Sequence, residues 1–197
     1  MQRFFKTIQF LPEDRNNEVL VGNCIHILHG ICRRHHINNI GISFPDWCHE
    51  TIGERMTFVS TDQQNLEYLL NQEYFFRMLQ LEYFNISDTQ IVTSMPTQEV
   101  IFIRNQAIDN CSPRAVRRDI KRAKKRALER GIQYIAPYAS SQNTFEHYHR
   151  IPIASQSTKT DFKINIQQLK VSQKVEGDFG NYGLSNKSDK QCSVPFI

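Results

Sequence analysis

The chain has 197 residues, of which 40% are hydrophobic and 11% aromatic, so it can bury a core and is not a disordered tail. Its formal net charge of +4 conceals an asymmetry, because nine basic and two acidic residues lie between Arg114 and Arg130. That segment carries +7 and leaves −3 for the other residues. A basic charge concentrated on one element points to a polyanionic partner.

The cysteines argue for a reducing compartment. They are five in number, widely spaced and without a CxxC pair, which disfavours both a disulfide framework and a zinc site. His26 and His29 lie three residues apart, but no second pair of ligands is near them in the sequence, so we expect no metal and no cofactor. The N-terminal MQRFFKTIQF lacks the apolar core of a signal peptide, and no apolar run approaches the roughly 18 residues that cross a membrane. The sequence therefore predicts a cytoplasmic protein with no membrane partner.

The first 95 residues show the element order βαββαβ. The expected elements are a strand at 4–10, a helix at 17–34, strands at 39–45 and 56–60, a helix from Thr61 or Asp62 past Leu79, and a strand at 82–92. This order is typical of a ferredoxin-like sandwich, in which two helices cover one face of an antiparallel sheet. The fold class predicted for the chain is α+β.

The polar segment TSMPTQE, with Pro96, separates this pattern from the next and predicts domains at 1–95 and 96–197. The second half begins with the strand VIFIRNQ and the basic helix, followed by irregular sequence from 131 to about 142. FKINIQQL alternates apolar and polar residues, as in a half-exposed strand, and EGDFGNYGLSNKSDK is rich in glycine and serine, as in a loop. We expect a second, divergent ferredoxin-related α+β domain.

The basic helix spans about 113–130, with Ser112 as N-cap, Pro113 in the first turn and Gly131 as the stop. On a helical wheel the cations gather on one side and the apolar residues Val116, Ile120, Ala123 and Ala127 on the other. We expect the apolar side to pack on the protein and the basic side to contact nucleic-acid phosphates, which position a ligand without reading its sequence. A merely solvated helix would carry more acidic residues in i,i+4 pairs.

Candidate catalytic residues include His29 in ILHGIC, Ser155 in SQST and Tyr182 in NYGLS. Taken alone, each more often has a packing or loop role than a catalytic one. The chain contains no GxSxG, P-loop or paired carboxylates, which argues against a triad hydrolase, an NTPase or a metal nuclease. Histidine, serine, tyrosine and a basic helix suit metal-independent RNA cleavage, in which the RNA supplies its own 2′-OH as nucleophile.

An ordered set of motifs resembles the CRISPR repeat-processing endoribonuclease of type I-F systems. The motifs are ILHGIC, IGISFPDW, RNQ before the arginine-rich helix, SQST, YGLSN and the terminal VPFI, and they span nearly the whole chain in the family's order. FFKTIQFLPEDRNNE and PDWCHETIGERMTFVS look most like the branch that accompanies CRISPR-associated transposons.

The resemblance implies roles for individual residues. His29 matches the histidine that acts in proton transfer at the 2′-OH, Ser155 the serine that orients the scissile ribose, and Tyr182 the tyrosine that positions the histidine. Arg104 and Gln106 match the pair that reads base edges at the foot of the repeat hairpin. The other residues expected to bind RNA are Arg114, Arg117, Arg118, Lys121, Arg122, Lys125, Arg126 and Ser157.

In that family the arginine-rich helix lies in the major groove of the RNA hairpin. Arg118 and Arg122 align with family arginines, whereas Asp119 and Ala123 stand where the family carries arginine. The resemblance further implies cleavage on the 3′ side of the hairpin, a 2′,3′-cyclic phosphate and a retained product. It also implies assembly with Cascade backbone subunits and, in the transposon branch, contact with a TniQ-type transposition protein.

Two other functions stay open on the sequence alone. The chain could cap a guide-RNA hairpin as a structural subunit that does not cut. It could also be a DNA-binding regulator that uses the basic helix, although the sequence shows no helix-turn-helix partner for that helix.

Overall fold

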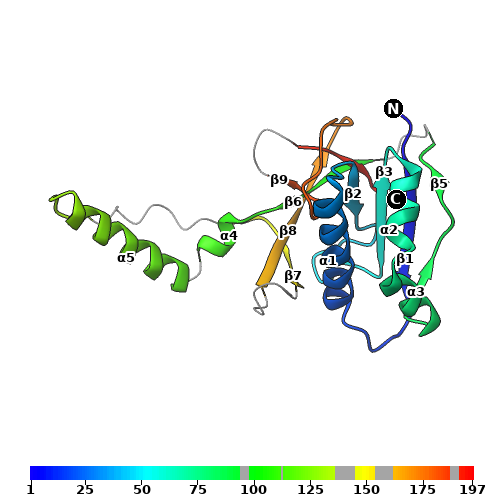
Figure 1. The fold of residues 1–197 in the computed structure, drawn as a ribbon, viewed down its shortest axis with the longest axis horizontal. Coiled ribbons are helices and arrows are strands. Elements are labelled where there is room, and N and C mark those ends of the chain that lie inside the picture. Colours follow the sequence, from blue (N-terminus) through cyan, green and yellow to red (C-terminus); the bar gives the residue numbers. More distant parts are fainter. Residues whose placement is uncertain (94–97, 112, 136–144, 154–161, 187–190) are drawn as a thin grey trace.

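The computed structural model describes residues 1–93, 98–111, 113–135, 145–153, 162–186 and 191–197. Two sheets and their helices form the body of the molecule, and one helix reaches away from it, which confirms the α+β class (Figure 1). The core of the predicted domain boundary, residues 94–97, lies outside the described residues, so the division into domains stays a prediction. Among the described helices, none is both long and apolar enough to cross a membrane.

The first sheet has the strand order β2-β3-β1-β4, and every pair in it is antiparallel. This is the arrangement that the βαββαβ pattern predicts for a ferredoxin-like fold. The strands are β1 (Phe4–Phe10), β2 (Ile40–Ser43), β3 (Arg55–Ser60), β4 (Phe84–Ile86) and the short β5 (Gln90–Ile91), which also pairs with β1. Helix α1 (Asn17–His35) follows β1, and its N-cap Asn16 accepts a hydrogen bond from the Val19 amide.

Two predicted elements are each split in the structure. The helix predicted beyond Asp62 is two helices, α2 (Gln63–Leu70) and α3 (Glu73–Gln80), because the backbone of Gln72 is extended, at φ −69° and ψ 149°. The strand predicted at 82–92 is divided into β4 and β5. Between them the Ser87 hydroxyl accepts the Thr7 amide proton at 3.0 Å and so replaces a ladder hydrogen bond.

The second sheet has the order β10-β6-β8-β7, with β9 parallel to β6. Its strands are β6 (Glu99–Arg104), β7 (His149–Ile153), β8 (Phe162–Val171), β9 (Ser185–Asn186) and β10 (Val194–Pro195). The sequence does not predict β7, a five-residue edge strand that contains Pro152, nor β9, which lies in the predicted C-terminal loop. The prediction of a half-exposed β8 is wrong, because Asn165 and Gln167 are buried as well as Ile164 and Ile166.

One hydrophobic cluster joins the two sheets. Phe102 of β6 packs against Phe44 and Trp47, with ring centroids 5.0 and 5.4 Å apart. Helix α1 lies against β7 as well as against its own sheet, and the two are very close at Gly22, where a Cβ would fall 2.0 Å from the Pro152 carbonyl oxygen. Helix α1 is therefore a layer that both halves of the chain share.

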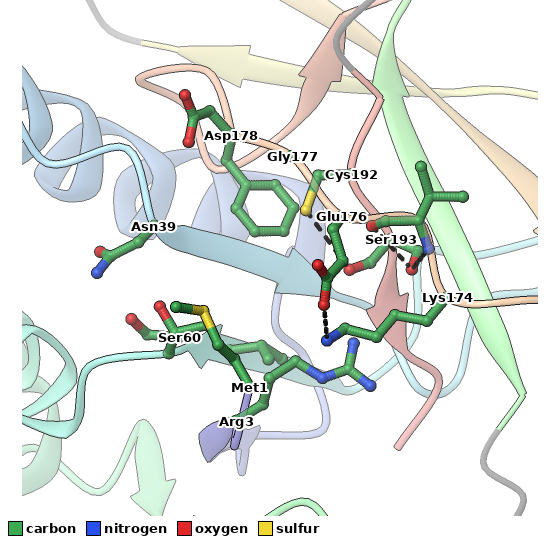
Figure 2. A pocket seen from close by; sticks show the side chains of 14 residues that line it. Met1, Arg3, Asn39, Ser60, Lys174, Glu176, Gly177, Asp178, Cys192 and Ser193 are labelled. Carbon is green, nitrogen blue, oxygen red and sulfur yellow. Dashed lines mark hydrogen bonds and ion pairs between the residues drawn. The ribbon is translucent and has the colours of Figure 1, made fainter.

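A cavity of about 320 Å³ opens beside β3, where the first residues of the chain meet the segment after β8 (Figure 2). Val59, Val175 and Phe179 contribute apolar walls, and Lys174 and Glu176 contribute charged groups. Among the residues that the structure describes, none of those predicted to bind or cleave RNA lines this cavity.

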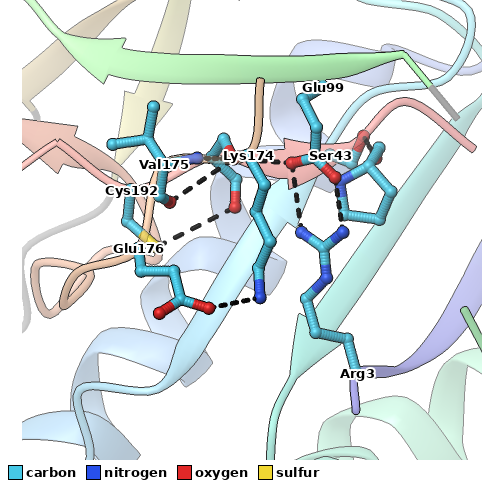
Figure 3. A network of polar contacts seen from close by, with 9 residues as sticks. Arg3, Ser43, Glu99, Lys174, Val175, Glu176 and Cys192 are labelled. Atoms are coloured by element: carbon cyan, nitrogen blue, oxygen red, sulfur yellow. Dashed lines mark hydrogen bonds and ion pairs between the residues drawn. The ribbon is translucent and has the colours of Figure 1, made fainter. Parts of the chain in front are cut away.

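A buried polar network on the wall of the cavity links the two sheets (Figure 3). The Arg3 guanidinium donates to both carboxylate oxygens of Glu99, and the Ser193 hydroxyl donates to the same carboxylate. Burial raises the pKa of Glu99, but the hydrogen bonds from Arg3 and Ser193 and the charges of Arg3 and Lys174 outweigh it, so the net pKa is lowered. Glu99 is therefore ionised and bridges the start of β1 and β6.

We predict that replacing Gly22 and Gly30 of α1 by alanine has opposite effects on the free energy of unfolding. Gly22→Ala must move α1 away from β7 and should lower the free energy of unfolding by about 2–3 kcal/mol. Gly30→Ala, with no neighbouring heavy atom within 4 Å, should raise it by roughly 0.5–1 kcal/mol through better helix propensity. Chemical denaturation of both variants measures the difference, and equal effects would contradict the close approach of α1 and β7.

Candidate active site and nucleic-acid interface

His29 on α1 and Tyr182 in the turn before β9 lie face to face. Their ring centroids are 4.3 Å apart and their planes differ by 7°. The His29 Nδ1 atom is buried, and no hydrogen-bond partner for it exists among the described residues. The stack therefore fixes the plane of the imidazole and covers one of its faces.

The pKa of His29 is lowered from its ordinary value of 6.5. Burial is the main cause, followed by the positive charge of Arg33 and by His26, while the nearby Asn181 backbone acts in the opposite direction. His29 is therefore neutral at neutral pH. A neutral imidazole is the form that can accept a proton from a substrate hydroxyl.

Arg104, the last residue of β6, completes this group. Its guanidinium carbon lies 4.9 Å from the centroid of the Tyr182 ring, so the cation is attracted to the aromatic face. Gln106, two residues further on, is exposed and marks the start of α4 (Ala107–Asn110). Of the predicted base-reading pair, Arg104 thus lies against the tyrosine, and Gln106 is exposed at the start of α4.

The turn that carries Tyr182 is fastened to the first sheet. The Gly183 carbonyl accepts a hydrogen bond from the Ile42 amide of β2 at 3.0 Å. Gly183 has φ +68°, and a Cβ at this position would fall 2.7 Å from side-chain atoms of both Leu28 and Ile42. Only glycine allows this turn to approach α1 closely enough to stack Tyr182 on His29.

The predicted basic helix is α5 (Pro113–Glu129), and it ends as expected. Gly131 has φ +67°, its amide donates to the Leu128 carbonyl, and the Ile132 amide donates to the Ala127 carbonyl, which closes the last turn. Within the described chain, the ion pairs of α5 are Arg118–Asp119 and Lys125–Glu129, each 3.8 Å long. Its cations therefore remain largely uncompensated by carboxylates.

The prediction that the apolar side of this helix packs on the protein is wrong for its first half. Val116 and Ile120 are 43% and 38% exposed, whereas Ala123 is half-buried and Ala127 is buried. Figure 1 shows the reason, because α5 reaches away from the sheets and joins them through α4.

The structure brings together three predicted site residues, His29, Tyr182 and Arg104, and places the predicted cations of α5 on a separate exposed helix. Ser155 and Ser157 lie outside the described residues, as does Ser112. Their roles stay predictions.

A second cluster of rings, which the sequence does not predict, joins the loop after β2 to the segment before β7. The rings of His49 and His147 stack at 4.3 Å, and Trp47 packs edge-on against His149 at 4.4 Å. The Nε2 atom of His149 lies 2.9 Å from the Cys48 carbonyl oxygen and 3.1 Å from Nε2 of His147. Because a carbonyl only accepts, the His149 Nε2–H donates to the Cys48 oxygen, and the His147 ring lies within hydrogen-bond distance of the same nitrogen. The alternating histidines of EHYHR are the sequence signal that could have indicated it.

These elements define an α+β protein in which a stacked histidine–tyrosine pair lies near the root of a basic helix. The model of the CRISPR-associated protein family Cas_Csy4 matches residues 5–196, and the chain therefore belongs to the Cas_Csy4 family. None of the curated proteins compared with the chain matches it.

Two solved structures are remotely similar. One is "Csf5, CRISPR-Cas type IV Cas6 crRNA endonuclease", which is 9% identical over 86% of this chain and 89% of its own, with a TM-score of 0.34. The other is "CRISPR associated protein Cas6", which is 10% identical over 98% of each chain, with a TM-score of 0.33.

We predict that protonation of His147 at acid pH lowers the stability of the folded protein. Burial lowers the pKa of His147, and His149 and His49 lower it further, so the unfolded chain binds this proton more readily than the folded protein. The stability contributed by the neutral ring is present above the ordinary pKa of 6.5 and declines as the pH falls from there towards the lowered value. Thermal unfolding across this range should show a shallower decline for His147→Gln, which keeps an acceptor but does not titrate. His29, whose pKa is also lowered, sustains part of the decline in both proteins. An unchanged pH dependence in the variant would contradict the prediction.

Proposed function

We propose that this protein is a metal-independent endoribonuclease that binds the hairpin of CRISPR repeat RNA and cleaves it on the 3′ side of the stem. The observation that carries the proposal is the neutral His29 imidazole, stacked on Tyr182 beside Arg104, in a chain of the Cas_Csy4 family. A histidine held in this way is suited to proton transfer, and the RNA brings its own nucleophile.

In the proposed reaction, His29 accepts the proton of the 2′-OH as that oxygen attacks the adjacent phosphorus. A bond forms between the 2′ oxygen and phosphorus, and the bond from phosphorus to the 5′ oxygen of the next nucleotide breaks. The leaving 5′ oxygen takes up a proton from water, so the products are a 2′,3′-cyclic phosphate and a 5′-hydroxyl. Tyr182 holds the imidazole plane, and Ser155 orients the scissile ribose.

RNA binding is assigned to the exposed cations of α5 and to the residues at its root. Arg104 and Gln106 read base edges at the foot of the hairpin, and Ser157 is a further contact. Phosphate contacts come from Arg114, Arg117, Arg118, Lys121, Arg122, Lys125 and Arg126, all of which are exposed. Binding should therefore weaken steeply with salt, since each neutralised phosphate releases counterions.

The finer assignment follows the motif resemblance. We propose that the protein belongs to a type I-F system, keeps its cleaved hairpin and joins Cascade backbone subunits in a prokaryotic cytoplasm. We further propose the transposon-associated branch, with a TniQ-type protein as a partner. Family membership supports the general CRISPR assignment, and the motifs FFKTIQFLPEDRNNE and PDWCHETIGERMTFVS support the branch.

The first test is incubation in EDTA with a labelled repeat hairpin and with the same RNA carrying one 2′-deoxy at the scissile ribose. We expect cleavage of the first RNA only, because the second lacks the nucleophile. His29→Ala should bind as the wild type does and cut about 10²–10⁴-fold more slowly, the usual contribution of a general acid or base. Tight binding of both RNAs with no cutting of either would instead identify a structural cap subunit.

The second test separates the tyrosine ring from its hydroxyl. The single-turnover rate should rise with pH and level off below pH 6.5, because the active His29 is neutral and its pKa is lowered. Tyr182→Phe keeps the stacked ring and should preserve this profile. Tyr182→Ala uncovers the imidazole and should move the inflection up towards 6.5 while slowing the reaction. Matching profiles for Tyr182→Ala and the wild type would remove the stack from the mechanism.

A further inference from the structure

Buried amide side chains fasten α4 to the second sheet. Asn105, directly after β6, donates from Nδ2 to Gln167 Oε1 on β8 at 2.6 Å, and its Oδ1 accepts from the Ala107 amide at 3.0 Å. Asn165, also on β8, donates from Nδ2 to Asp109 Oδ1 on α4 at 2.7 Å. Asn105 and Asn165 are each 1% exposed and Gln167 is 5% exposed. We call these three amides the α4 mount.

The α4 mount also holds the chain that returns to β7. Gln167 Nε2 donates to the Glu146 carbonyl at 2.9 Å, and the Asn105 amide donates to the Asn165 carbonyl at 2.9 Å. A buried amide that loses its hydrogen bonds costs free energy, so the bonded groups hold one another in position.

The mount lies directly behind the candidate active site. Successive side chains of a strand point to opposite faces, so Asn105 is directed away from the face on which Arg104 meets Tyr182. Arg104 pairs with Ile166 across β6 and β8, and Asn165 and Gln167 flank Ile166. One pair of strands therefore presents the base-reading arginine on one face and the mount on the other.

Helix α5 depends on this attachment for its direction. Val116, Ile120 and Leu128 are 43%, 38% and 82% exposed, and Figure 1 shows the helix leaving the body at α4. With 17 residues, α5 is about 25 Å long, so a tilt of about 10° at its root would move its far end by roughly 4 Å. A shift of that size exceeds the tolerance of a hydrogen bond to a phosphate.

We propose that Asn165 and Gln167 are positioning residues for RNA recognition. By holding α4 they set the direction of α5 relative to Arg104 and the His29–Tyr182 stack, so that one bound hairpin meets both the cations of the helix and the residues at its foot. The RNA part of this proposal rests on the proposed function.

The direction of α5 can be measured without RNA. Spin labels on non-natural amino acids at Gln64 and Leu128, both exposed, report the distance between α2 and α5. Asn165→Leu should broaden or shift that distance distribution. Ile164→Val, in the same strand but on the hydrophobic core side, should leave it as in the wild type.

A second pair of variants covers the case in which Asn165→Leu does not fold. Asp109→Ala removes the same hydrogen bond from the α4 side, because the Asp109 carboxylate accepts from Asn165. It should change the distance between the two labels as Asn165→Leu does. Asn110→Ala, on the same helix, is its control. A distance distribution unchanged by the Asn165 and Asp109 variants that fold overturns the proposal.

Binding of the repeat hairpin provides the functional readout. The variant that moves α5 should bind about tenfold more weakly, and its salt slope should fall by about one for each phosphate that the helix no longer neutralises. It should also discriminate less against a hairpin with a changed foot base pair. Wild-type affinity and salt slope in that variant would overturn the positioning role. If the wild type binds but does not cut, the cleavage proposal fails, and the distance and binding measurements still decide the role of the mount.

Discussion

The close approach of α1 to β7 is the constraint on which the candidate site depends. His29 belongs to the first half of the chain, whereas Arg104 and Tyr182 belong to the second, so the stack forms only if the halves are held in register. Gly22 permits that register because its missing side chain lets the helix backbone reach the Pro152 carbonyl. Gly22 thus helps to set the position of His29, which lies about two helical turns further along α1.

In the proposed function, catalysis and RNA binding belong to separate parts of the molecule. The stack sits against the shared core, where burial lowers the pKa of His29. The cations sit on α5, an outlying helix whose like charges repel and whose apolar residues find little cover. The closing turn at Gly131 and the attachment at α4 help to stabilise such a helix. A bound polyanion would reduce the repulsion between its positive side chains.

The sequence predicts those elements whose signals are local. The strand order of the first sheet and the bounds of α5 follow from hydrophobic period, Pro113 and Gly131. The break at Gln72 and the burial of Asn165 have no local signal, because packing of α3 and the position of α4 decide them. No local signal predicts that His29 contacts the second half of the chain either. Residue spacing gives no information on contacts between positions as distant in the sequence as His29 and Tyr182. Only the motif resemblance predicted that they belong to one site.

The hydrogen bond between the Ile42 amide and the Gly183 carbonyl means that the tyrosine turn is already in place before any RNA arrives. A preorganised catalytic pair loses little conformational entropy when the ligand binds, whereas an outlying helix loses more on being immobilised. If the proposed function holds, different parts of the chain set the lifetime of the RNA complex and the rate of cleavage within it. Each could be altered by substitution with little change in the other.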